Sequence, residues 1–152
     1  MNELKDLYQE VIFDHNRNPR HFGKLAHASC HAEGFNPLCG DKVSVYLKFN
    51  DQGVIEDVSF DGSGCAISVA TASLMTETLV GKTRVEAEAM FERFHSMMLG
   101  EESRGDAAAL GKLEVLSGVR EFPSRIKCAT LAWHTLLAAL KEEQDRGSVS
   151  TE

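Results

Sequence analysis

The chain has no excess of positive charge. Of its 152 residues, 16 are lysine or arginine and 23 are aspartate or glutamate, so the formal net charge is −7. Nucleic acids are bound through clustered basic side chains that neutralise phosphates, and anionic membranes attract the same residue types. We therefore expect neither nucleic acid nor a membrane surface among the partners.

The chain also has no apolar run long enough to cross a bilayer, because the longest candidate is the short stretch 136–140. Residues 1–10 are charged and amphipathic, unlike the apolar core of a secretory signal. Both features predict a cytoplasmic protein. The length suits one domain with its own core, which we assign to residues 1–144, followed by a disordered polar tail at 145–152.

Closely paired cysteines are absent too. The four cysteines, Cys30, Cys39, Cys65 and Cys128, are widely spaced and form no CxxC motif. In a reducing compartment such cysteines act as metal ligands or reactive thiols more often than as disulfide partners. The residues around each cysteine must therefore indicate its role.

The hydrophobic pattern changes along the chain from helix to strands and back to helices. Helical spacing predicts a first helix over residues 1–16, and alternation predicts strands within 25–35, at 42–49 and at 54–60. A glycine-containing break at 61–64 precedes a helix at 65–80, and Thr83 with Glu86 forms a capping-box pattern for the next, which ends near residue 99. We expect one or two short helices within 107–122 and a final helix from Pro123 to about Glu143. This order predicts an α+β fold, in which a three-stranded antiparallel sheet carries helices on one face.

Cys39 and Asp41 are two residues apart in a turn that leads into a predicted strand, with Gly40 between them. On extended backbone, side chains two apart point the same way, so both could reach one ion. Cys65 and Cys128 lie at or near the starts of predicted helices, where free N–H groups and the helix dipole favour a thiolate.

Three thiolates and one carboxylate suit tetrahedral zinc, so Cys39, Asp41, Cys65 and Cys128 are the candidate metal ligands. Arg125 and Lys127 lie within one helical turn of Cys128 and could offset the negative charge of such a site.

Other cysteine and histidine groupings are less favoured. We expect Cys30 to be a small buried side chain within a strand. A rival cluster of His27, Cys30, His31 and Cys39 is disfavoured because adjacent residues of a strand face opposite sides. We interpret His134, six residues beyond Cys128, as a packing or surface residue.

With these residues identified, the chain resembles the IscU/NifU N-terminal family of iron–sulfur cluster assembly proteins. The resemblance is carried by three cysteine motifs, NPLCGD at 36–41, DGSGCAISVATASLM at 61–75 and RIKCATLAWHTL at 125–136. Within the family the chain is most similar to the SufU branch. It has an added segment between about residues 100 and 122, and Lys127 stands where IscU-type proteins have a histidine.

The SufU resemblance implies a zinc-dependent protein that takes persulfide sulfur from a SufS-type cysteine desulfurase and serves downstream cluster assembly proteins. It implies that Cys39 accepts the sulfur, that Asp41, Cys65 and Cys128 retain the zinc, and that Arg125 steadies the ligands. A histidine of the desulfurase would replace Cys39 on the metal and free its thiolate for attack.

Two other functions remain open at this point. The first is a scaffold on which iron or a [2Fe–2S] cluster is assembled and passed to apo-proteins, which Lys127 disfavours. The second is a structural zinc module, which ranks last because a domain of this length has a core of its own.

Overall fold

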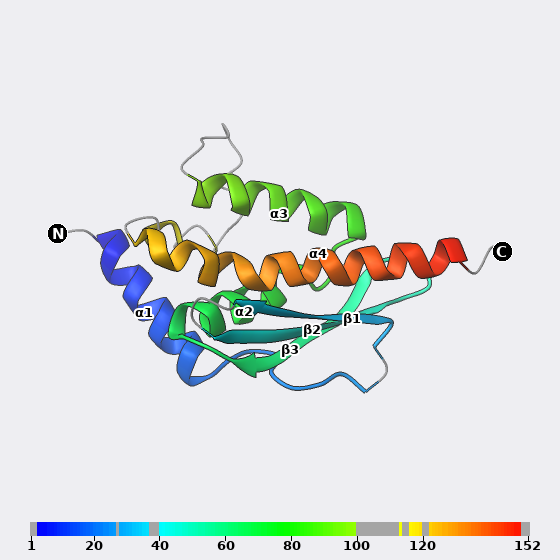
Figure 1. Ribbon diagram of the computed structural model, residues 1–152, viewed down its shortest axis with the longest axis horizontal. Helices are drawn as coiled ribbons and strands as arrows, with labels where there is room; N and C mark the ends of the chain where they lie inside the picture. The colour runs from blue at the N-terminus through cyan, green and yellow to red at the C-terminus, as the bar shows by residue number, and fades with distance from the viewer. Residues whose placement is uncertain are drawn as a thin grey trace.

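The structure is a computed structural model, and it describes residues 3–26, 28–36, 40–99, 113, 116–119 and 122–149. The chain begins with helix α1, continues through a meander of strands, and ends in helices (Figure 1). The elements in order are α1 (Glu3–Arg17), β1 (Cys30–Asn36), β2 (Asp41–Phe49), β3 (Ile55–Ser63), α2 (Ala66–Leu79), α3 (Arg84–Met98), the 3₁₀ turn η2 (Pro123–Arg125) and α4 (Ile126–Val149).

The strands form one three-stranded antiparallel sheet in the order β1-β2-β3, as the alternating pattern predicts. Along β2, Val43, Val45 and Leu47 are buried, whereas the residues between them are at least partly exposed. Asn36 pairs with Asp41 and Lys42 pairs with Ser63. The end of β1, the start of β2 and the end of β3 therefore meet at one edge of the molecule.

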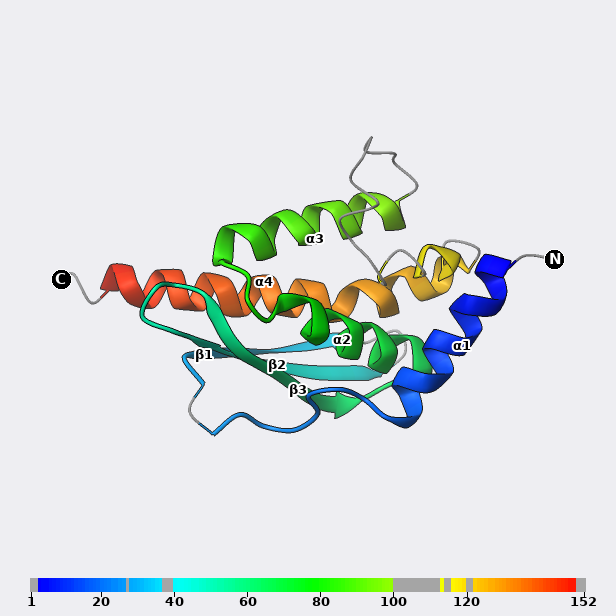
Figure 2. The same ribbon diagram turned by 180° about the vertical axis from the view of Figure 1, so that it is seen from behind.

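The helices cover a single face of the sheet, which confirms the predicted α+β class. Helix α4 crosses β1 and β2, and α2 contacts both β3 and α4 (Figures 1 and 2). Helix α1 packs against α2, while α3 lies on α4 on the side away from the sheet. The core lies between sheet and helices and includes the fully buried Trp133, Phe94 and Phe60. Among the described residues, no helix combines the length and apolarity that a membrane span requires.

Several boundaries differ from the sequence-based expectations. Strand β1 begins at Cys30, later than residue 25, where the predicted strand begins. The Ser29 N–H still donates to Leu47 O of β2 at 2.7 Å, whereas farther back in the chain the Gly23 N–H donates to Phe60 O at 2.7 Å, along the outer edge of β3. Strand β3 continues to Ser63 through the expected break at 61–64. Gly62 permits this, because its φ of 140° is a conformation that other residues rarely adopt.

The last helix is longer than predicted. It extends to Val149 rather than ending near Glu143, since the residues after Glu143 include good helix formers and no proline. Most of the predicted short helices within 107–122 lie outside the described residues, although 116–119 form a 3₁₀ turn. The assignment of residues 1–144 to a single domain stays a prediction, and α4 extends five residues, 145–149, into the tail 145–152 that was expected to be disordered.

Candidate metal centre

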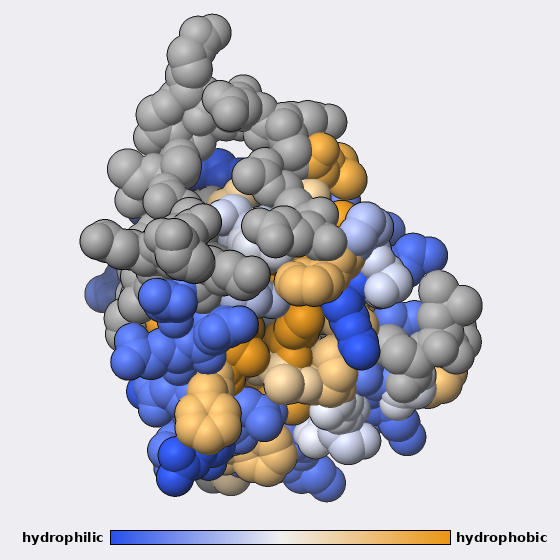
Figure 3. Space-filling model, turned by 90° about the vertical axis from the view of Figure 1, so that its left-hand side faces the viewer, coloured by the Kyte–Doolittle hydropathy of each residue, from blue (hydrophilic) through white to orange (hydrophobic). Residues whose placement is uncertain are grey.

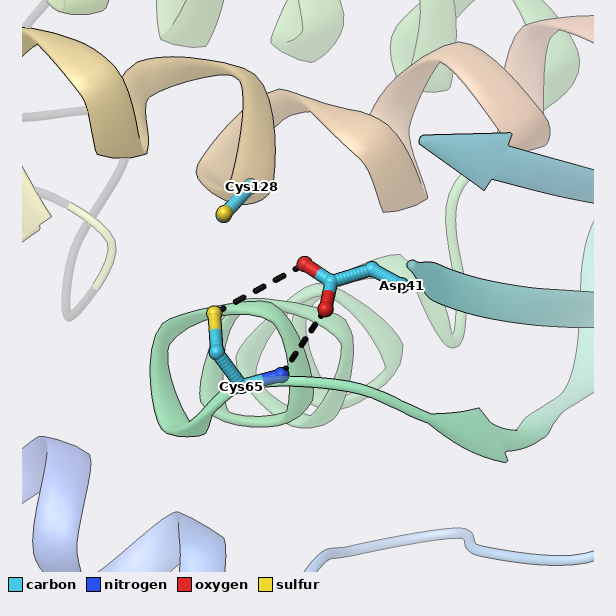
Figure 4. Close-up of side chains that lie close together, drawn as sticks. All are labelled: Asp41, Cys65 and Cys128. Carbon is cyan, nitrogen blue, oxygen red and sulfur yellow. Dashed lines mark hydrogen bonds between the residues drawn. The ribbon is translucent and has the colours of Figure 1, made fainter. Parts of the chain in front are cut away.

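Three of the predicted ligands meet at the end of the molecule where the sheet edge and two helix starts converge. Asp41 is the first residue of β2, Cys65 is the N-cap of α2, and Cys128 lies in the first turn of α4. One donor atom from each of the three lies within 4.8 Å of the others. Figure 4 shows the Cys128 sulfur directed toward the Asp41 carboxylate and Cys65.

Asp41 is held in place by the backbone of Cys65. Its Oδ1 accepts a hydrogen bond from the Cys65 N–H at 3.0 Å, and its Oδ2 lies 3.6 Å from the Cys65 sulfur. The carboxylate is only 2% exposed. Gly64 makes this approach possible, because a Cβ there would lie 2.9 Å from Asp41 Oδ1. With Oδ1 engaged by the N–H group, Oδ2 is the oxygen that faces the two sulfurs.

Cys65 occupies the N-terminus of α2 as its capping residue. The Ser68 N–H donates to the Cys65 sulfur at 3.4 Å, so the sulfur takes the place that a hydroxyl or carboxylate oxygen usually fills at an N-cap. Free N–H groups and the helix dipole at this end stabilise a thiolate. The residue as a whole is half-buried.

Cys128 is 1% exposed, and Arg125 lies beside it at the surface. The pKa of Arg125 is raised above its ordinary value, first by a hydrogen bond with Cys128 and then by the negative charge of Cys65. The same attraction favours the thiolate forms of the two cysteines. Arg125, one of the two residues expected to offset the negative charge of the site, therefore lies beside the sulfurs. Lys127, the other, is exposed, and the structure assigns it no contact with the sulfurs of Cys65 and Cys128.

Cys39, the fourth predicted ligand, lies outside the described residues. Its described neighbours in sequence, Asn36 and Gly40, belong to the same hairpin as Asp41, and the Gly40 N–H donates to Asn36 O at 2.8 Å. Gly40 has a φ of 75°, a backbone conformation that residues other than glycine rarely adopt. The assignment of Cys39 as a ligand stays a prediction.

The other cysteine and histidine candidates lie away from this centre. Cys30 is 1% exposed within the core, while its neighbour His31 is exposed and stacks on Tyr46. These described members of the rival cluster therefore face opposite sides of the sheet, as expected; His27 lies outside the described residues. His134 is exposed and packs against Phe91 and His95.

The donor set fits zinc. Zinc bonds to sulfur at about 2.3 Å and to carboxylate oxygen at about 2.0 Å, which places donors of one tetrahedral ion about 3.3–3.8 Å apart. The donor atoms of Asp41, Cys65 and Cys128 lie within 4.8 Å of one another, so they would have to move closer together to share one ion. Buried sulfurs and a carboxylate beside a guanidinium can hold a cation or act as nucleophiles.

Two features of the centre were missed by sequence reasoning. The first is the bond from the Cys65 N–H to Asp41, which joins residues 24 positions apart. The second is the close approach of Gly64 to that carboxylate. The glycine pair before Cys65 signals a close backbone approach, but nothing local indicates which side chain approaches.

The chain matches a protein-family model and several named relatives. The family description NifU-like N-terminal domain matches residues 7–129. The chain is 43% identical to an iron–sulfur cluster assembly scaffold protein IscU of Streptococcus pyogenes, over 93% of this chain and 87% of the relative. It is also 43% identical to the zinc-dependent sulfurtransferase SufU of Bacillus subtilis, over 93% of this chain and 94% of the relative.

Among solved structures, the SUF-system protein FiSufU of Fervidobacterium islandicum, described as a putative scaffold, matches with a TM-score of 0.82 and 41% identity. That match covers 89% of this chain and 97% of the other.

Proposed function

Since the chain belongs to the NifU-like N-terminal domain family of iron–sulfur cluster assembly proteins, we propose that it is a zinc-dependent sulfur-transfer protein. The observation that carries the proposal is the convergence of Asp41, Cys65 and Cys128, whose donor atoms lie within 4.8 Å. The relative from Bacillus subtilis, named a zinc-dependent sulfurtransferase, supports the same choice.

The proposed ligands are Asp41, Cys65, Cys128 and Cys39. When bound, zinc keeps sulfur ligands in the thiolate form and shields them from oxidation. Asp41 presents one oxygen to the site because its other oxygen accepts the Cys65 N–H. Arg125 balances the negative charge of the sulfurs from the solvent side.

Cys39 is the proposed sulfur acceptor. Its thiolate attacks the outer sulfur of a persulfide on the donor protein, and a new sulfur–sulfur bond forms as the donor's own bond breaks. The donor cysteine leaves as a thiolate, and Cys39 becomes the persulfide. The step exchanges one sulfur–sulfur bond for another and needs no external oxidant or reductant.

The proposed partner is a SufS-type cysteine desulfurase, which supplies the persulfide, and the proposed recipients are downstream cluster assembly proteins. The cytoplasm is the proposed location, because this chemistry needs reduced thiols. Figure 3 shows apolar side chains gathered among polar ones on the side of the molecule that is at the left in Figure 1. Phe122 and Phe35, 48% and 59% exposed, precede η2 and Asn36 and supply apolar contact area near the centre.

The test is the turnover of a SufS-type desulfurase with this protein either zinc-loaded or metal-stripped. We expect strong stimulation by the zinc form, loss of stimulation on stripping, and loss in Cys39→Ala. Mass spectrometry should show one added sulfur atom on the unmodified protein and none on that variant. Cys30→Ala is the matched control, because Cys30 is a buried core cysteine outside the centre. Normal persulfide uptake by Cys39→Ala would refute the assignment.

A cluster scaffold is the second candidate function. The relative from Streptococcus pyogenes carries the scaffold name at the same 43% identity as the sulfurtransferase. Two sulfurs and a carboxylate could also hold iron. If neither metal state stimulates the desulfurase, anaerobic reconstitution with iron and sulfide is the next experiment. Cluster absorption bands that disappear in Cys65→Ser would then support the scaffold.

A further inference from the structure

Two histidines, one on α3 and one on α4, lie next to each other where these helices pack together. The ring centroids of His95 and His134 are 5.8 Å apart, with ring planes at 78°. Phe91 packs against both rings, stacked on His95 at 5.4 Å and edge-on to His134 at 5.3 Å. His95 is half-buried and His134 is exposed, so solvent reaches the pair.

This geometry suits shared coordination of one metal ion. Neutral imidazole is the commonest protein ligand of transition metals, and zinc–nitrogen bonds are about 2.0–2.1 Å long. Two imidazoles on one tetrahedral ion then have ring centres about 5–6 Å apart, a range that includes the observed separation.

The lowered pKa of His134 favours metal binding at neutral pH. Burial lowers the pKa of His134, and the nearby His95 lowers it further. A metal ligand must be unprotonated, so this environment keeps a nitrogen lone pair available.

We propose that His95 and His134 form a second binding site for a divalent transition-metal ion of the zinc class, bridging α3 and α4. Within the described part of the chain, the one group of three or more potential ligands is Asp41, Cys65 and Cys128. The histidine site therefore has two described ligands, with water in the remaining positions, and binds zinc more weakly than the cysteine centre.

Occupation of the site would stabilise the outer layer of the fold. Helix α3 packs on α4 on the side away from the sheet. An ion held by one histidine from each helix would join them, and binding to the folded state alone raises the unfolding temperature. The proposal does not depend on the sulfur-transfer function.

The test uses the full chain saturated with zinc at its tightest site, to which further Zn²⁺ is added. We expect the imidazole NMR signals of His95 and His134 to shift together, and the unfolding temperature to rise. His95→Ala and His134→Ala should each weaken this second binding at least tenfold. His31→Ala is the matched control and should leave it unchanged, because His31 lies exposed on the sheet.

The NMR measurement needs no variant, so it remains informative if a substitution disturbs packing. The proposal is overturned if the two ring signals stay fixed as zinc is added, or if only one of them moves. It is also overturned if either histidine variant retains the second binding at full strength.

Discussion

The carboxylate of Asp41 accepts a hydrogen bond from the backbone N–H of Cys65 at 3.0 Å, which ties the start of β2 to the start of α2. One proposed ligand thus orients another before any metal is bound. This contact couples the backbone around Cys65 to the charge of Asp41. It leads directly to two predictions about the centre.

Gly64→Ala should weaken zinc binding without unfolding the protein. The added methyl group would lie 2.9 Å from Asp41 Oδ1 and 3.0 Å from its Cγ, so the carboxylate must move. Changes that reorient a ligand typically reduce metal affinity by about 10–100-fold. Competition with a chromophoric chelator measures the affinity, and the exposed neighbour Ser63→Ala is the control. Unchanged zinc affinity in Gly64→Ala would contradict the prediction, because it would show that the Asp41 carboxylate tolerates the added methyl group.

Asp41→Asn separates the hydrogen bond that this side chain accepts from its proposed role as a zinc ligand. The amide oxygen can still accept the Cys65 N–H, so the thermal unfolding midpoint of the metal-free protein should change little. Zinc affinity should fall by at least about tenfold, because a neutral amide replaces a charged ligand. Calorimetric titration with zinc and circular dichroism measure the two quantities. Equal zinc affinity in variant and parent would remove Asp41 from the ligand set.

Arg125→Gln should move zinc binding to higher pH. The raised pKa of Arg125 reflects attraction between its guanidinium and the sulfurs of Cys128 and Cys65, and by reciprocity the guanidinium favours their thiolates. Without that charge, protons compete better with zinc for sulfur, so a higher pH is needed for the same occupancy. The pH profile of zinc binding measures this shift. Lys127→Gln is the control, and an equal shift in both variants would contradict a specific role for Arg125.

Ser73→Ala should loosen the contact between α1 and α2. The Ser73 hydroxyl oxygen accepts the Arg20 N–H at 2.8 Å and lies 2.7 Å from Nδ1 of the buried His15. Removal of the Ser73 hydroxyl, which both the Arg20 N–H and the His15 ring contact, should lower the free energy of unfolding by about 1–3 kcal/mol. Denaturant unfolding of the metal-free protein measures the change. A loss as small as that of the exposed control Ser63→Ala would contradict the structural role.

His134 should make the fold less stable in mild acid. Its pKa is lowered from 6.5 in the folded protein, so near and below that pH the unfolded chain binds more protons. Stability therefore rises with pH through this window and falls as the pH drops. His134→Gln should flatten that dependence in denaturant unfolding between about pH 5 and 7. An unchanged slope in His134→Gln would contradict this prediction.

Much of the architecture follows from local sequence patterns. Alternation along residues 42–49 predicted the central strand, and Thr83 with Glu86 predicted the capping box that begins α3. Cys65 was expected at a helix start and is the N-cap of α2. These predictions succeeded because strand alternation and helix capping depend on residues a few positions apart.

Local patterns were less informative where the outcome depended on partners far along the chain. Residues 61–63 looked like a loop, yet pairing with β2 extends β3 through Gly62 to Ser63. Residues 25–29 were expected to belong to the first strand, yet β1 begins at Cys30, and it is residues 21–23 that pair with the outer edge of β3 at Phe60. These boundaries depend on which strands pair, and the sequence of one strand does not indicate its pairing partner.

By itself, the sequence determined which residue types are available for chemistry, and the elements that carry Asp41, Cys65 and Cys128. Only the tertiary structure decided that the Cys65 N–H meets Asp41, that Arg125 flanks Cys128, and that His95 faces His134. The physical reason is that contacts between elements depend on strand register and on how helices pack across the sheet. Strand register and helix packing are fixed only when all the elements pack together around the core.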